Sequence, residues 1–377
     1  MLERLSHGAK SVDANSLAAA LDRSGGVGPG FNTLRLAAAI AVLLTHAFDL
    51  SHAGYTVEPV RIFSGRQASL GGIGFYCLFI ISGFLVTASF TRSRSISDFA
   101  WKRATRIFPG LVAVTALAML VLGPSVTTLS LGEYFSNARF YAYLSSLTLF
   151  GSYDLPGVFS SNPVPNVVNG SLWTLRYELI CYVVLALSGA AGLLRRGWFV
   201  LLVTLVLIPA GWWARGRQLY SFAPLGLELA DALRMSAYFA AGSAAYVFRN
   251  VIVLDRRMAI AAGLVSLILL RVGCFHLFFP VLGAYLVAYL GMQPRLGFRI
   301  LLANDYCYGA FIYAFPIQQL VVLFGPDHAP WWFNAIVSLP LTLICAYLSW
   351  HVIEKPAMSL ARETRSRNLI ETRPSTI

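Results

Sequence analysis

Charged side chains are scarce in this sequence of 377 residues, of which 12% are charged and 57% are hydrophobic. Soluble domains carry about 25% charged residues, so this composition, with a mean hydropathy of +0.66, excludes an ordinary soluble domain. Aromatic residues make up 13% of the chain, which is typical of the belts that form at membrane surfaces. We therefore expect an all-α integral membrane protein.

Paired cysteine motifs are also missing. The five cysteines lie in apolar segments and none forms a C-x-x-C pair, so we interpret them as free buried thiols rather than disulfides or metal ligands. We find no cleavable signal peptide and no internal repeat, and the lack of a repeat disfavours an inverted-repeat transporter. We attribute the net charge of +12 to basic cytoplasmic loops rather than to nucleic-acid binding.

Long hydrophobic runs dominate what is present. The predicted membrane helices number ten and fall at about 33–50, 71–91, 104–123, 171–193, 198–213, 232–248, 258–273, 275–291, 304–324 and 331–353. A shorter apolar segment, 139–151, is expected to be re-entrant or interfacial. We expect a flexible N-terminal tail over 1–30, a transmembrane domain over 31–356 and a C-terminal tail over 357–377.

Lysine and arginine distribute unevenly over the predicted loops. With a cytoplasmic N-terminus, 21 of them lie in inside loops and 5 in outside loops. The outside five are Arg61, Arg66, Arg139, Arg215 and Arg217. The positive-inside rule then predicts that both termini are cytoplasmic.

The first predicted helix carries two ionisable residues, Arg35 and His46, which are eleven positions apart. On an α-helix this spacing places them on one face, about 16 Å apart along the axis. Ionisable groups inside a span are costly and indicate function by default. Each residue also has a structural interpretation. Arg35 could anchor the helix by extending its side chain to the membrane surface, and His46 could be a hydrogen-bonded residue at the interface.

Two further stretches lie in the second and third predicted helices. Glycines in GGIGFYCLFIISGFLV, residues 71–86, predict close helix packing. Lys102, Arg103 and Arg106 lie at the cytoplasmic start of the third helix, where Arg103 and Arg106 share a face. They indicate either an ordinary basic loop or a cradle for an anionic phosphate ligand, which Arg35 would join.

An acidic residue lies inside the fourth predicted helix, in NGSLWTLRYELICY. Glu178 at that depth needs a partner or a wet cavity. A structural ion pair with Arg176 is one interpretation. The other is an acid–base pair with His46, since both lie at similar predicted depths from the outer face.

These motifs together resemble one known family. The Arg-x10-His spacing, FYCLFIISGFLV, RIFP, LWTLRYELICY, DYCYGAFIYAFPIQQ (305–319) and WHVIEKP (350–356) occur in the order seen in the acyltransferase-3 family. The resemblance covers about residues 31–360. It implies a membrane O-acyltransferase of the bacterial cytoplasmic membrane, which takes acetyl from cytoplasmic acetyl-CoA and modifies a cell-surface or lipid-linked carbohydrate. The sequence does not carry the SGNH domain that some members append.

The resemblance also implies roles for individual residues. His46 matches the essential histidine of the family and Arg35 its partner arginine. Arg103 and Arg106 match basic positions thought to meet the CoA phosphates, and Glu178 matches the acidic residue of the LWTL-x-x-E motif. With His46 as general base and Glu178 beside it, the expected reaction needs acetyl-CoA as donor and no metal.

Other functions are compatible with the same residues. A glycolipid transporter or flippase would use His46 and Glu178 as a proton relay without an acyl donor. A second class of membrane O-acyltransferase also uses an intramembrane histidine, but it does not predict Arg-x10-His in the first span. Within the acyltransferase prediction, His46 acts as a general base or as a covalent nucleophile. Gln318 and Gln319 either bind sugar hydroxyls or form hydrogen bonds within the bundle.

Overall fold

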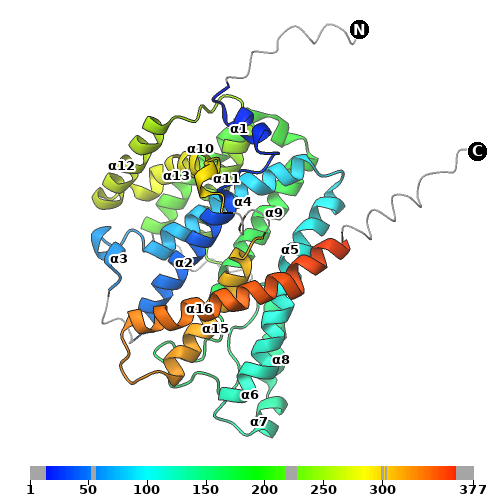
Figure 1. Ribbon diagram of the computed structural model, residues 1–377, viewed down its shortest axis with the longest axis vertical. Helices are drawn as coiled ribbons and strands as arrows, with labels where there is room; N and C mark the ends of the chain where they lie inside the picture. Colours follow the sequence, from blue (N-terminus) through cyan, green and yellow to red (C-terminus); the bar gives the residue numbers. More distant parts are fainter. Residues whose placement is uncertain (1–13, 52–56, 218–226, 299–300, 302–303, 362–377) are drawn as a thin grey trace, which may run out of the picture. The chain divides into compact units, whose positions relative to one another are not determined.

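The computed structural model describes residues 14–51, 57–217, 227–298, 301 and 304–361. The described chain is built from helices, and its only β pairing is an isolated bridge between Ser16 and Val253. Figure 1 labels most of its helices along the chain. The chain divides into two compact units. Unit 1 comprises Met1–Ala38, Pro59–Arg92 and Tyr177–Ala303, and unit 2 comprises Ala39–Glu58, Ser93–Arg176 and Asn304–Ile377.

Apolar helices occur at all ten predicted spans. Within the described residues, seven are long and apolar enough to cross a membrane: Phe31–Leu50, Leu70–Thr91, Ile96–Val126, Gly170–Ala190, Gly197–Gly216, Cys307–Phe324 and Trp331–Ala361. The remaining three predicted spans are α11 (Leu229–Val247), α12 (Arg256–Val272) and α13 (Phe275–Gly291). Helices α12 and α13 have 17 residues each, which is at the lower limit for a span. The all-α membrane fold is confirmed.

The short apolar segment at 139–151 does not form a span. It folds into α8 (Ala138–Ala142) and a 3₁₀ helix, η2 (Tyr143–Thr148). Together these supply about half of the ~20 residues that a crossing needs. Helix α7 (Leu131–Ser136) precedes them and begins with a capping box, in which Ser130 donates to Glu133 and lowers the pKa of that carboxyl.

Unit 1 is organised around α11, which packs against α4 (Leu70–Thr91) and α10 (Gly197–Gly216). Glycines make these approaches close. A Cβ at Gly83 would lie 2.0 Å from the carbonyl oxygen of Phe239, and a Cβ at Gly242 would lie 2.0 Å from that of Ile80. The close packing predicted from the glycines of 71–86 is therefore confirmed.

The N-terminal segment of unit 1 corrects one expectation. Residues 14–30 are not a flexible tail, because Leu17–Arg23 form helix α1, which Ser16 caps. The backbone N–H groups of Leu17 and Ala18 donate to the carbonyls of Ile252 and Arg249, and the side chain of Leu17 is fully buried. The buried side chains of Leu17 and Leu21 hold α1 against the rest of unit 1. The polar residues around them made the segment look like a tail in the sequence. Residues 1–13 of the predicted tail lie outside the described residues.

Unit 2 combines three long helical segments with the loop 149–169. Helix α5 (Ile96–Leu117) continues through a π-helical turn, η1 (Ala118–Leu122), into α6 (Gly123–Val126). Helices α15 (Cys307–Phe324) and α16 (Trp331–Ser349) pack closely, and Gly309 meets the backbone of Ala346. A second π-helical turn, η7 (Trp350–Glu354), follows α16. This unit holds His46, Arg103 and Arg106.

Candidate active site

His46 lies near the end of α2 (Phe31–Leu50), where it is half-buried in unit 2. Its imidazole meets the ring of Phe315 on α15 edge-on, with 5.3 Å between centroids and 81° between the ring planes. A few residues further on, Phe48 stacks on Trp331 at the start of α16, 4.1 Å between centroids. Aromatic contacts thus hold both the imidazole and the end of its helix.

A buried amide ties α2 to α15 close to His46. Gln318 is fully buried, and its Nε2 donates to the backbone carbonyl of Leu43 across 2.9 Å. The backbone carbonyl of Gln318 accepts from Nδ2 of Asn334 on α16 at 3.2 Å. The Oε1 atom of Gln318 is buried and has no hydrogen-bond partner among the described residues. A buried acceptor without a partner costs free energy and therefore needs an explanation.

Gln319 has a different role. Its Nε2 donates to the carbonyls of Val164 and Val167, and its Oε1 accepts from Nδ2 of Asn162. These bonds fix the loop 162–167 against α15, so Gln319 follows the interpretation of hydrogen bonding within the bundle.

The segment before α9 (Leu175–Ala190) also converges on Phe315. Asn169 is buried and donates from Nδ2 to the carbonyl of Ile312 at 2.8 Å. Gly170 begins a 3₁₀ turn, η3 (Gly170–Thr174), and any side chain at position 170 would overlap the ring of Phe315. Asn169 and Gly170 therefore bring the start of the NGSLW motif onto the residue that contacts His46.

Arg106 on α5 lies in a largely buried ion-pair network. Its Nη2 binds Oδ2 of Asp305 at 2.7 Å, and its Nη1 binds Oε2 of Glu354 at 3.2 Å. The guanidinium also lies over the rings of Tyr308 and Trp350, 5.7 and 5.5 Å from their centroids. Because one cation meets two carboxylates, a phosphate that approached Arg106 would have to displace one of them.

Further hydrogen bonds hold the two carboxylates in place. Asp305, two residues before α15, accepts from the backbone N–H of Cys307, and Glu354 accepts from the hydroxyl of Ser349. Both carboxylates come from the DYCYG and WHVIEKP motifs, but the sequence alone did not connect them to Arg106. Arg103, one turn earlier on α5, is half-buried and lies 5.9 Å from the centroid of the Phe99 ring.

Arg35 lies in the first turns of α2, within unit 1, and is half-buried. The start of this helix is anchored by two side chains: Nδ2 of Asn32 donates to the carbonyl of Leu301 at 2.6 Å, and Oγ1 of Thr33 donates to that of Leu296 at 2.5 Å. The turn that carries Arg35 is consequently fixed relative to the segment after α13.

Glu178 lies on α9 in unit 1 and accepts hydrogen bonds from two hydroxyls. Ser82 of α4 donates to Oε1 at 2.8 Å, and Tyr182 donates to the same oxygen. In the described part of this unit, hydroxyls rather than a cation meet the carboxylate. Arg176 belongs to unit 2, where it donates to the hydroxyl of Tyr153 and lies over its ring.

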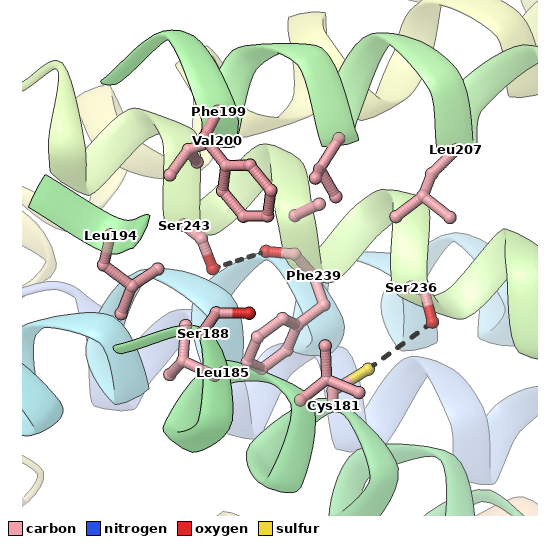
Figure 2. Close-up of a pocket in the computed structure, with 13 residues that line it drawn as sticks. Cys181, Leu185, Ser188, Leu194, Phe199, Val200, Leu207, Ser236, Phe239 and Ser243 are labelled. Carbon is pink, nitrogen blue, oxygen red and sulfur yellow. Dashed lines mark hydrogen bonds between the residues drawn. The ribbon is translucent and has the colours of Figure 1, made fainter. Parts of the chain in front are cut away.

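An apolar cavity of about 300 Å³ lies one turn from Glu178 along α9. Figure 2 shows its lining, which comes from α9, α10 and α11 and from Leu194 in the turn before α10. Three of its polar side chains make contacts within the wall: the hydroxyl of Ser243 donates to the carbonyl of Phe239, and Cys181 contacts Ser236 at 3.8 Å. The cavity suits hydrocarbon rather than a charged ligand.

The described residues contain no group of three or more His, Cys, Asp or Glu side chains that would hold a metal ion. The fold and these residues define a multi-pass membrane protein with a histidine near the end of a spanning helix and partly buried arginines on another. Residues 29–351 match the family model described as an acyltransferase domain. The chain therefore belongs to the acyltransferase-3 family, and it is a membrane-embedded O-acyltransferase.

Two relatives match most of the chain. An O-acetyl transferase of Shigella phage Sf6 is 30% identical, over 86% of this chain and 94% of the phage protein. Nodulation protein 10 of Rhizobium leguminosarum bv. viciae is 29% identical, over 92% of this chain and 98% of that protein. No solved structure matches the chain significantly.

Proposed function

We propose that this protein transfers an acetyl group from acetyl-CoA to a hydroxyl of a cell-surface or lipid-linked carbohydrate, with His46 as the general base. The observation that carries the proposal is an ionisable imidazole near the end of an apolar helix, oriented by Phe315. The family supports acyl transfer, and the phage relative is named as an O-acetyl transferase.

The reaction needs one proton to move and none to be consumed. The acceptor oxygen bonds to the acetyl carbonyl carbon while the carbon–sulfur bond of the thioester breaks. His46 takes the hydroxyl proton and returns it to the departing thiolate, which leaves as free CoA. An imidazole suits this exchange because its ordinary pKa is about 6.5. Gln318 donates to the backbone of α2 just before His46. Its Oε1, which has no partner among the described residues, would accept a hydrogen bond from a second hydroxyl of the carbohydrate.

Donor binding rests on arginines in this proposal. CoA carries several phosphate charges, and guanidinium groups bind phosphate in a bidentate manner. We assign Arg35 and Arg103 as residues that donate hydrogen bonds directly to the CoA phosphates. Arg106 joins them when a phosphate replaces one of its two carboxylate partners. Glu178 is assigned as a second acid–base group, with Ser82 and Tyr182 holding its carboxylate.

The proposed location is the bacterial cytoplasmic membrane, with both termini in the cytoplasm. Donor then enters from the cytoplasm, where the basic loops lie, and the acceptor approaches from the opposite side. The bilayer and a carbohydrate acceptor are the partners of this reaction, and no nucleic acid takes part.

The test follows radiolabelled acetyl from acetyl-CoA into envelope glycans, in membranes that contain the wild type or His46→Ala. We expect His46→Ala to fold, to bind acetyl-CoA and to lose nearly all transfer. His328→Asn is the control, because His328 lies exposed in a loop with a left-handed φ of 59°, which asparagine tolerates. Near-normal labelling by His46→Ala would refute the proposal.

A second measurement separates the base from a nucleophile. Purified protein is incubated with labelled acetyl-CoA in the absence of acceptor, and the protein is then examined by mass spectrometry. A general base leaves the protein unlabelled, whereas a covalent route leaves acetyl on His46.

A further inference from the structure

A second cavity, of about 500 Å³, lies at one end of unit 1. Four helix ends meet there: α10 and α12 end, and α4 and α13 begin. Three arginines, two tryptophans and one buried histidine give it its character: Arg66, Arg215, Arg217, Trp212, Trp213 and His276.

The charge of this cavity is unusual for its side of the membrane. The topology predicted from the sequence leaves five arginines and lysines outside, and three of those five line this one cavity. Outer loops normally avoid such residues. Among the described residues, none of the three arginines takes part in an ion pair, whereas nearby Arg234 pairs with Asp231. No carboxylate of the described residues therefore holds any of the three guanidinium groups at ion-pair distance, although Arg215 interacts electrostatically with Asp231.

The wall of the cavity is rigidly held. His276 binds the carbonyl of Gln67 through Nε2 at 2.8 Å and the hydroxyl of Tyr238 through Nδ1 at 3.0 Å. The side chain of Gln67 donates to the carbonyl of Leu270 at 2.5 Å and accepts from the N–H of Phe275 at 3.2 Å. This network joins the loop before α4 to the turn between α12 and α13.

The residue next to this network, Arg66, has a left-handed backbone with φ of 66°. A non-glycine residue adopts this conformation rarely and at an energetic cost. Because Gln67 is fixed at two helix ends, the surrounding structure maintains the conformation and with it the position of Arg66 at the cavity. The arginine is thus preorganised rather than merely exposed.

We propose that this cavity binds the phosphate group of a lipid, with Arg66, Arg215 and Arg217 around the phosphate. Guanidinium groups match phosphate oxygens in number and geometry. The half-exposed indoles of Trp212 and Trp213 suit the boundary between headgroup and hydrocarbon, where such a lipid lies. A phosphate ester on a membrane lipid and one on a lipid-linked saccharide share this chemistry. Lipid binding at this cavity can be measured separately from acyl transfer, because it does not require acetyl-CoA.

The experiment measures lipid binding to the purified full chain in detergent, by native mass spectrometry, without acetyl-CoA. The probes are a long-chain polyprenyl phosphate and phosphatidylglycerol, each titrated with and without inorganic pyrophosphate. The test variant is Arg215→Gln/Arg217→Gln. The control is Arg61→Gln/Arg271→Gln, which removes two arginines of the same unit that do not line the cavity.

We expect the test variant to bind the preferred lipid at least about tenfold more weakly than the control variant. Arg215→Lys/Arg217→Lys retains the charge and should recover part of the affinity. Competition by pyrophosphate supports recognition of phosphate. Tighter binding of the polyprenyl phosphate assigns the site to a lipid-linked saccharide, and equal binding of both probes assigns it to membrane lipid.

Two results would overturn the proposal: equal lipid binding by the test and control variants, or no competition by pyrophosphate with either probe. Acetyl-CoA affinity is measured on the same samples. Loss of lipid binding with acetyl-CoA binding retained separates this site from the donor site, and failure of acetyl transfer in the wild type would leave the lipid result intact.

Discussion

Gln318 donates from Nε2 to the backbone carbonyl of Leu43 across 2.9 Å, one turn before His46 on the same helix. The bond joins α15 to α2 at the level where Phe315 meets the imidazole. The amide therefore sets the position of the segment that carries His46, and its Oε1 remains available as an acceptor.

Gln318→Leu should lower turnover about tenfold or more while leaving acetyl-CoA affinity unchanged. Leucine has a similar size but supplies neither the donor for Leu43 nor the free acceptor. Small displacements of a catalytic group are costly for rate, whereas one neutral hydrogen bond contributes only about 1 kcal/mol to stability. Steady-state kinetics, with kcat and KM determined separately, and thermal unfolding measure the two effects.

Gln319→Leu is the matched comparison for this prediction. The amide of Gln319 binds the loop 162–167 rather than α2. Its loss should therefore lower the unfolding temperature and leave the turnover of the folded protein nearly unchanged. If the two leucine variants lose turnover equally at equal stability, Gln318 has no special role in positioning His46.

Periodicity and hydropathy were sufficient to predict the helices, because apolar length and loop charge leave strong local patterns. They also marked Arg35, His46, Arg103, Arg106 and Glu178 as ionisable residues that need an explanation. Partners distant in the chain were not predictable: Asp305 and Glu354 lie 199 and 248 positions from Arg106. Residues 14–30 were misjudged because the contacts of Leu17 with the 249–254 segment are equally non-local.

Arg106→Ala should destabilise the protein by about 3 kcal/mol, because it leaves the buried carboxylate of Glu354 and the partly buried carboxylate of Asp305 without their cation. Glu354 is 1% exposed, so water does not replace the lost partner. Adding Glu354→Gln to Arg106→Ala removes one uncompensated charge and should restore part of the loss. Thermal unfolding in detergent measures both variants.

The same pair of variants also tests the proposed contact with CoA. If Arg106 binds phosphate, the double variant regains stability but not acetyl-CoA affinity. Recovery of both quantities together would assign Arg106 to structure alone.

Glu178→Gln should fold normally and turn over poorly. Glutamine keeps an oxygen that accepts from Ser82 and Tyr182, so the packing of α9 against α4 is preserved. What disappears is the negative charge and its ability to exchange a proton. Tyr182→Phe is the control, because it removes one of those hydrogen bonds and keeps the carboxylate. Normal turnover per folded molecule in Glu178→Gln would exclude an acid–base role.

Membrane topology is open to a direct test. The distribution of 21 inside and 5 outside basic residues predicts that reporters fused to either terminus remain cytoplasmic, and that a tag inserted in 218–226 is exposed on the opposite side. Alkaline phosphatase and fluorescent-protein fusions report the two sides in complementary ways. An active phosphatase at either terminus would reverse the scheme, and with it the direction of donor entry.

Arg35→Ala should weaken acetyl-CoA binding by about 10- to 150-fold, the loss expected for a charge-assisted bond of about 1.5–3 kcal/mol. The helix start that carries Arg35 is anchored through Asn32 and Thr33, so the guanidinium is presented from a fixed backbone. Arg35→Lys should recover little, because an ammonium group does not reproduce a bidentate contact. Arg257→Ala is the control, since Arg257 is exposed in the first turn of α12, on the side predicted to be cytoplasmic. Calorimetric titration with acetyl-CoA provides the measurement, and equal affinities in the Arg35 and Arg257 variants would remove Arg35 from the donor site.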